Sequence, residues 1–146
     1  MSVGPPDTIS RSGFLTIAAL LAILALVLNE TQATLEEAQV DIIVRNMRTG
    51  LQVAIGEHLM RGQDNRLGEL LTENPIRFLN RPPQGYVGES TAPEGSGCWR
   101  YDPDSRVLEY RPRHPGAFGG REQLRWRLAA IGVAAGRPAG LRLERM

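Results

Sequence analysis

The sequence predicts an α+β fold in which a long N-terminal helix, apolar in its first part, packs on a small antiparallel sheet of about four strands. The first observation is the apolar run Phe14–Leu28, which is followed by helical spacing of apolar residues to about Arg61, with no proline between Pro6 and Pro75. The second is a change to alternating apolar residues after Cys98, which is typical of strands. One helix followed by short antiparallel strands is an α+β arrangement.

The apolar run Phe14–Leu28 has 15 residues, and Thr16 is its only polar member. As a helix it spans roughly 22 Å, whereas the hydrocarbon core of a bilayer is about 30 Å thick. The uncharged positions up to Leu35, interrupted by Glu30, bring the run close to that length. A helix that is apolar on all sides lies in lipid or in protein, and the remaining chain is too small to enclose it. We therefore expect residues 14–35 to span a membrane.

A cleaved secretory signal has a similar apolar length. Here the run is followed by continued helical spacing and not by a small-residue cleavage site, so we expect the segment to be retained. Arg11 precedes the run, and the positive-inside rule then places the short N-terminal tail in the cytoplasm and the rest of the chain on the other side.

Residues 36–62 form the amphipathic outer part of the predicted helix. Its apolar stripe recurs every three or four positions: Val40, Val44, Met47, Leu51, Ala54, Ile55, His58 and Leu59. We expect His58 to be packed and hydrogen-bonded, Glu36 and Glu37 to lie on a solvated face, and Gly62 to end the helix. Gly50 and Gly56 each cost about 1 kcal/mol relative to alanine, and they indicate either close packing or simple tolerance.

Residues 63–97 are predicted to hold short helices and a loop. Asp64 is a candidate N-cap for a helix over 65–72, and Asn74 is a candidate cap for a turn over 76–79 that Pro75 begins. The stretch Pro82-Pro83-Gln84-Gly85 breaks regular structure, and the residues after it either begin a strand or stay extended.

Residues 98–146 are predicted to form the sheet. Cys98–Asp102 and Val107–Tyr110 form a hairpin around a turn that Asp102 begins. A third strand covers 123–131, the residues 137–140 turn the chain, and the last strand covers 141–143. Cys98 is the only cysteine, which excludes an internal disulfide and paired-cysteine metal sites; a small buried thiol is favoured over a reactive or intermolecular one.

The sequence offers little chemistry. It contains no P-loop, no GxSxG and no HExxH motif, and we predict no enzyme activity, no cofactor and no metal. All 17 basic residues are arginine, and net charge is +1. Strand alternation places Arg125 and Arg127 opposite Trp126. A solvated strand face is the favoured interpretation of these arginines, and contact with DNA or another anionic ligand is the alternative.

The tripeptide Ser12-Gly13-Phe14 stands at the head of the apolar run. It resembles the prepilin processing site of type IV pilins and type II secretion pseudopilins. In that family, prepilin peptidase cuts after the glycine of a short polar leader and methylates the new N-terminus. The resemblance implies a leader of residues 1–13, a mature chain that starts at Phe14, and a pilin-like fold. The processing residues would be Gly13 and Phe14.

The resemblance also implies a location and partners. The chain would be a single-pass protein of the bacterial inner membrane with a periplasmic C-terminal domain. Its partners would be prepilin peptidase, the assembly platform of a pilus or a type II secretion system, and other pilin-like subunits; whether it enters a filament is left open by the sequence.

Two features depart from the family pattern. Ala18 occupies the position that usually carries glutamate, and no proline stands near Leu35, where the family helix is often interrupted. Such departures favour a minor or accessory subunit. The later chain also resembles small accessory proteins of mannose-sensitive-haemagglutinin-type pilus systems, in Asn74-Pro75, Pro82–Tyr86, Trp99-x-Tyr101-Asp102 and Leu108-x-Tyr110.

We therefore predict a structural or assembly subunit, a minor pilin or pseudopilin. The alternative is a membrane-anchored extracytoplasmic binding module that uses the basic sheet face of Arg125 and Arg127. A third hypothesis, a signal-anchored enzyme, has no catalytic constellation in its support.

Overall fold

A computed structural model describes residues 10–90 and 95–146 of the chain. Most of the predicted leader, residues 1–9, lies outside the described residues. One long helix, α1 (Arg11–Met60), is followed by two short 3-10 helices, η1 (Asp64–Thr72) and η2 (Pro75–Phe78). The strands are β1 (Tyr86–Glu89), β2 (Cys98–Asp102), β3 (Val107–Arg111), β4 (Leu124–Ala134) and β5 (Arg137–Arg145), with η3 (Pro115–Phe118) between β3 and β4. The predicted α+β class is confirmed.

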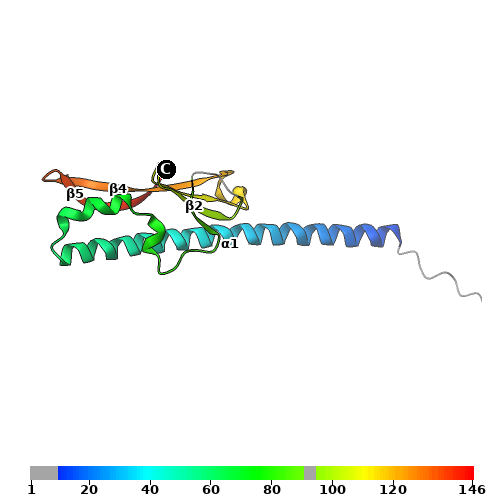
Figure 1. Cartoon of the computed structure of the whole chain (residues 1–146). Helices are drawn as coiled ribbons and strands as arrows, with labels where there is room; N and C mark the ends of the chain where they lie inside the picture. The colour runs from blue at the N-terminus through cyan, green and yellow to red at the C-terminus, as the bar shows by residue number, and fades with distance from the viewer. Residues whose placement is uncertain (1–9, 91–94) are drawn as a thin grey trace, which may run out of the picture.

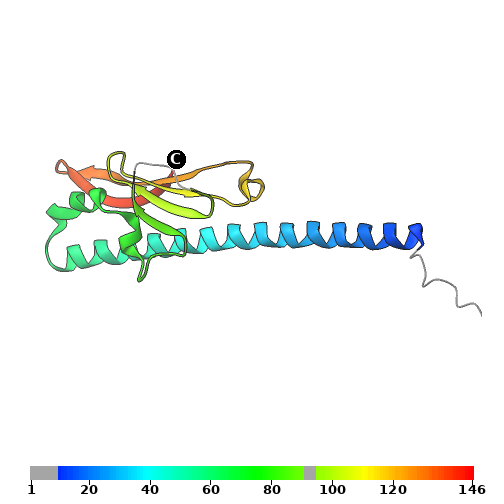
Figure 2. The same cartoon turned by 45° about the vertical axis from the view of Figure 1, so that its right-hand side comes forward.

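The helix α1 is continuous over 50 residues. Its first part projects beyond the sheet, and only its second part lies along the sheet (Figures 1 and 2). The side chain of Ser10 caps the first turn by accepting a hydrogen bond from the Gly13 N–H at 3.1 Å. The helix ends where Gly62 adopts a φ of 66°, as predicted. The prediction of one uninterrupted helix is confirmed, with a start three residues earlier than Phe14.

The sheet has five strands in the order β1-β2-β3-β4-β5, one more than predicted. The additional strand β1 pairs in parallel with β2 through Tyr86 and Trp99, whereas all other pairs are antiparallel. A parallel neighbour has no hairpin turn next to it in the sequence, so turn signals left the residues after Gly85 open between a strand and an extended segment. The structure has the strand.

The β4–β5 hairpin is longer than predicted, and the turn predicted at 137–140 is wrong. The chain reverses at Ala135 and Gly136, both with positive φ (53° and 76°). Positive φ at both central residues is what the favoured two-residue hairpin loop requires. Residues 137–140 instead belong to β5, which pairs with β4 as far as Trp126 and Arg145.

The core lies between the inner face of the sheet and the second part of α1. Trp99 and Trp126 stack there with ring centroids 5.5 Å apart. The predicted helical stripe supplies buried Val40, Val44, Met47, Leu51 and Ile55, and the sheet supplies buried Tyr101, Leu108, Tyr110, Leu124, Leu141 and Leu143. Leu59 was assigned to the stripe wrongly, because its side chain is 53% exposed at the end of the helix.

The two glycines of the outer helix have different roles. A Cβ on Gly50 would overlap the carbonyl oxygen of Phe78 and lie 2.8 Å from its carbonyl carbon. A Cβ on Gly56 would meet nothing within 4 Å. Gly50 therefore permits the close approach of η2 to α1, and Gly56 is tolerated.

The two predicted caps of the short helices also differ. Asn74 caps η2, since its Oδ1 accepts a hydrogen bond from the Ile76 N–H at 3.1 Å. The prediction that Asp64 caps the preceding helix is wrong: Asp64 is already the first residue of η1, and Gln63 stands at the cap position without a side-chain hydrogen bond.

Candidate functional site

The predicted processing residues lie at the free end of the projecting helix. Gly13 and Phe14 belong to the first turn of α1, and Phe14 is 65% exposed. The Thr16 hydroxyl donates a hydrogen bond to the Ser12 carbonyl at 2.8 Å, so this turn is closed by local bonds alone. Within residues 10–90 and 95–146, Phe14 is not buried by any other element, so the Gly13–Phe14 peptide bond lies in a single capped and exposed turn.

The apolar part of α1 is exposed on every side. Leu20, Leu21, Ile23, Leu24 and Leu28 are each more than half exposed, and the most apolar 18-residue window of the helix has no buried residue. This helix is long and apolar enough to cross a membrane. Among the described residues, the sheet leaves this segment uncovered, whereas helices that are apolar on all sides are typically buried in lipid or protein.

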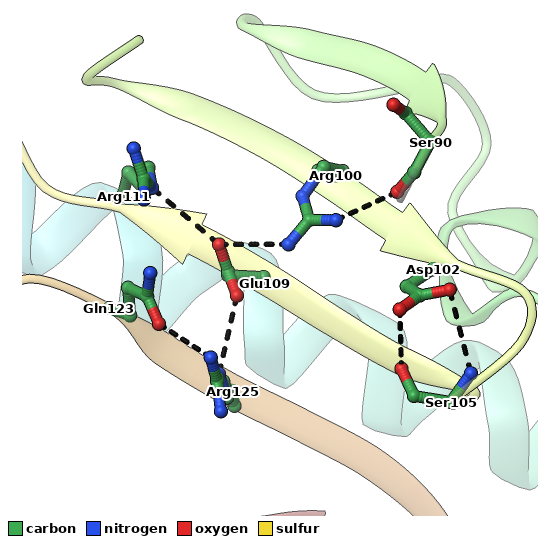
Figure 3. A network of polar contacts seen from close by, with 8 residues as sticks. All are labelled: Ser90, Arg100, Asp102, Ser105, Glu109, Arg111, Gln123 and Arg125. Atoms are coloured by element: carbon green, nitrogen blue, oxygen red, sulfur yellow. Dashed lines mark hydrogen bonds and ion pairs between the residues drawn. The ribbon is translucent and has the colours of Figure 1, made fainter. Parts of the chain in front are cut away.

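The predicted basic face is the outer face of the sheet, opposite Trp126, as the alternation predicted. Glu109 is buried there among three arginines, at 3.1 Å from Arg100, 3.6 Å from Arg111 and 3.2 Å from Arg125. Figure 3 shows Arg125 held between Glu109 and Gln123. A buried carboxylate needs such partners because desolvation disfavours its charge.

Arg127 is also paired. Its Nε lies 3.1 Å from Glu144, which also accepts from Arg142 at 3.0 Å. The hydrogen bond from Arg127 lowers the pKa of the Glu144 carboxyl, with Arg142 adding to the effect. Arg125 and Arg127 are thus brought to one face, and each lies beside a carboxylate that compensates its charge.

A second buried carboxylate, Glu36, lies where α1 enters the domain. Its side chain is 8% exposed. One oxygen accepts from the Tyr110 hydroxyl at 2.7 Å and from the Arg113 N–H at 2.6 Å. The other accepts from the His114 N–H at 2.9 Å and lies 2.8 Å from His114 Nδ1. We call these four residues the Glu36 cluster.

The Glu36 cluster alters two pKa values. Burial raises the pKa of Glu36, but the hydrogen bonds from Tyr110, Arg113 and His114 outweigh burial and hold it below its ordinary value. Burial, and then the hydrogen bond to Glu36, raise the pKa of Tyr110. A carboxylate that accepts four hydrogen bonds fixes the loop after β3 to the helix.

The prediction of a solvated face for Glu36 and Glu37 is therefore wrong for Glu36 and confirmed for Glu37, which is exposed. The burial of Glu36 does have a sequence signal, which is its position on the face of the helix. Glu36 stands four positions before Val40 and thus on the buried stripe. The partnership with His114, 78 residues away, has no sequence signal.

His58 is confirmed as a hydrogen-bonded residue, with Nδ1 2.9 Å from the Ala54 carbonyl oxygen. Cys98 is half-buried, and its thiol donates to the Ser96 carbonyl at 3.5 Å. Within residues 10–90 and 95–146, no three His, Cys, Asp or Glu side chains are grouped as metal ligands.

Neither a protein-family model, nor a curated protein, nor a solved structure matches this chain.

Proposed function

We propose that the chain is a pilin-like structural subunit, a minor pilin or pseudopilin of a type IV pilus or type II secretion system. The observation that supports it most is the two-part helix α1. Its first part exposes apolar side chains on all sides, and its second part is buried against a small sheet. A soluble domain gains nothing from such a projection, whereas a subunit that moves from a bilayer into a bundle of helices requires it.

The physical basis is the similarity of the two environments. A helix that is apolar all round exchanges lipid for neighbouring helices at a small net cost, because both are apolar. The absence of a carboxylate at Ala18 removes the buried partner that the family uses for a neighbouring N-terminus. This difference favours an accessory position over the abundant subunit.

The proposed location is the bacterial inner membrane, with Phe14–Leu35 in the bilayer and the sheet domain in the periplasm. Prepilin peptidase, the assembly platform and other pilin-like subunits are the proposed partners. The exposed and locally capped turn at Gly13 and Phe14 supports processing at this bond.

The test is the N-terminal sequence of full-length protein extracted from membranes of cells that carry prepilin peptidase. We expect a start at Phe14 with a methylated amine. Gly13→Val should leave the chain starting at Met1, and the matched variant Ser12→Ala should still be cut. A native start at Met1 or beyond Leu28 would contradict the proposal.

Anionic-ligand binding by Arg125 and Arg127 stays the weaker hypothesis, because both arginines have carboxylate partners. Retention of the full-length protein on duplex DNA that weakens with salt and is lost on Arg125→Gln/Arg127→Gln would support it.

A further inference from the structure

A groove of about 510 Å³ runs along α1 at the end of the domain from which the apolar segment projects. Its volume is in the range of small-molecule sites. One wall is the helix, and the other is formed by the chain before β1, the start of β2 and the loop after β3. The groove is lined among others by Gln32, Leu35, Gln39, Ile42, Gln84 and Arg113.

The groove is amphipathic. Leu35 and Ile42 are 56% and 55% exposed and form an apolar strip on the helix. The amides of Gln32, Gln39 and Gln84 supply hydrogen-bond donors along the same groove. This combination suits a molecule with an apolar chain and a polar, acceptor-rich head.

Arg113 supplies a positive charge to the groove. Its side chain lies across Gly97, where a Cβ would come within 3.0 Å of the Arg113 Cγ and Cζ atoms. Among the described residues, the ion pairs of the domain use other arginines, so the Arg113 guanidinium has no carboxylate within 4.0 Å. A guanidinium can bind a phosphate through two parallel hydrogen bonds.

The acidic residues of the helix do not compensate Arg113. Glu36 lines the groove, but its oxygens already accept from Tyr110 and from the loop that carries Arg113. Glu37 and Asp41 stand two positions on either side of Gln39, about 160° around the helix. They line a separate cavity together with Arg121.

The position of the groove relative to the bilayer follows from the length of the helix. Phe14 and Leu35 are separated by about 32 Å of helix, close to the hydrocarbon thickness of about 30 Å. The groove then lies in the headgroup layer. This step rests on the proposed membrane anchoring.

We propose that this groove binds a phospholipid of the surrounding bilayer. Arg113 and the amides of Gln39 and Gln84 hold the phosphate, and the acyl chain next to the glycerol passes Leu35 toward the hydrocarbon. The groove opens beside the segment that the same lipids surround, so the ligand is supplied by the membrane itself.

The test places the photoreactive residue p-benzoylphenylalanine at single positions of the full-length protein in phosphatidylcholine–phosphatidylglycerol vesicles. At Gln39, inside the groove, irradiation should give a phospholipid adduct that mass spectrometry identifies. At Asp41, on the opposite side and at nearly the same height, the adduct should be at least fivefold weaker. Leu24, inside the apolar segment, reports on membrane insertion.

The arginine variants test the phosphate contact. Arg113→Gln should lower the adduct at Gln39 about fivefold, the effect typical of one arginine near an anionic lipid surface. Arg113→Lys should restore part of it, and Arg121→Gln, the matched change beside Asp41, should leave it unchanged. An unshifted emission spectrum of the buried Trp99 and Trp126 shows that each variant is folded.

Three results would overturn the inference. They are equal lipid adducts at Gln39 and Asp41, an adduct at Gln39 that Arg113→Gln leaves unchanged, and a protein–protein adduct at Gln39, which would assign the groove to a second copy. If Leu24 gives a lipid adduct in these cases, only the groove assignment is wrong. If Leu24 gives none, the membrane anchoring fails as well.

Discussion

Replacing Gly50 by alanine tests whether the close approach of η2 to α1 holds the domain together. In an exposed helix interior this change stabilises by about 1 kcal/mol, because alanine restricts the unfolded chain and favours the helix. At Gly50 the added Cβ overlaps the Phe78 carbonyl oxygen and lies 2.8 Å from the carbonyl carbon. Ordinary carbon–carbon contact is about 3.5 Å, so η2 must move by at least about 0.7 Å.

That movement of η2 costs free energy. The obstructing atoms belong to the backbone, and the neighbouring Pro75 and Ile76 of η2 are themselves buried. Overpacking of a core costs about 1–3 kcal/mol. After subtraction of the helix gain, we expect Gly50→Ala to lower the free energy of unfolding by up to about 2 kcal/mol.

Gly56→Ala is the matched control. It lies six positions later in the same helix with open space around it, and we expect it to raise the free energy of unfolding by about 0.5–1 kcal/mol. Gly50→Ala should then melt below Gly56→Ala by roughly 2–12 °C, at about 4 °C per kcal/mol for a domain of this size.

Tryptophan fluorescence of the full-length protein in mild detergent measures this difference. Trp99 and Trp126 are 1% and 3% exposed in the sheet–helix core, so their emission shifts when the domain unfolds. If Gly50→Ala melts at or above the temperature of Gly56→Ala, then the contact with Phe78 is not the reason for glycine at this position.

Three further changes probe other parts of the chain. Glu36→Gln should lower the free energy of unfolding by about 2 kcal/mol, as a charged hydrogen-bond acceptor is lost, whereas exposed Glu37→Gln should stay within about 0.5 kcal/mol in urea unfolding. The pKa of Glu36 is lower in the folded chain than its ordinary value of 4.5, so its carboxylate stabilises the fold above that pH. This stabilisation is lost as the pH falls through the pKa of the folded state. Urea unfolding at a series of pH values should show the loss in the native chain and not in Glu36→Gln. Asn74→Ala removes the cap of η2 and should cost about 1–2 kcal/mol, with no change in stability arguing against the cap. Leu21→Arg places a charge in the middle of the apolar segment at a cost of about 3 kcal/mol; it should reduce flotation with vesicles, while Leu59→Arg should not, and equal flotation would argue against a membrane span.

The elements that local patterns determine could be predicted from the sequence. The spacing of Val40, Val44 and Met47 predicted the buried side of the helix, and the alternation around Trp99 and Trp126 predicted the inner face of the sheet. Asn74-Pro75 predicted the cap of η2, because cap and first-turn proline are adjacent in the chain.

The features that depend on distant residues could not be predicted. The strand β1 forms only because Tyr86 reaches Trp99 in parallel, and the four-residue segment alone does not require a strand. The sequence leaves open whether Gly50 marks close packing or is simply tolerated, and only the position of Phe78 decides between the two. The burial of Glu36 depends on a loop more than 70 residues later, although its phase on the helix was available as a signal.

The candidate sites divide in the same way. The proposal for Gly13 and Phe14 rests on a tripeptide beside an apolar run, which is a wholly local signal. Arg125 and Arg127 were placed on the correct face by alternation, but their carboxylate partners come from other strands. The groove beside Arg113 combines the helix, the chain before β1 and two strands, and no contiguous motif marks it.

Because helix α1 is unbroken, the tilt of its apolar first part also sets the orientation of the sheet domain. No proline or hinge separates Leu35 from Met60, which are about 38 Å apart along the helix. In the proposed membrane span, a tilt of 20°, which is about average for a spanning helix, would displace Met60 sideways by about 13 Å together with the sheet. Neighbouring helices and bilayer thickness, which both influence the tilt of a spanning helix, would thus also influence the orientation of the sheet domain.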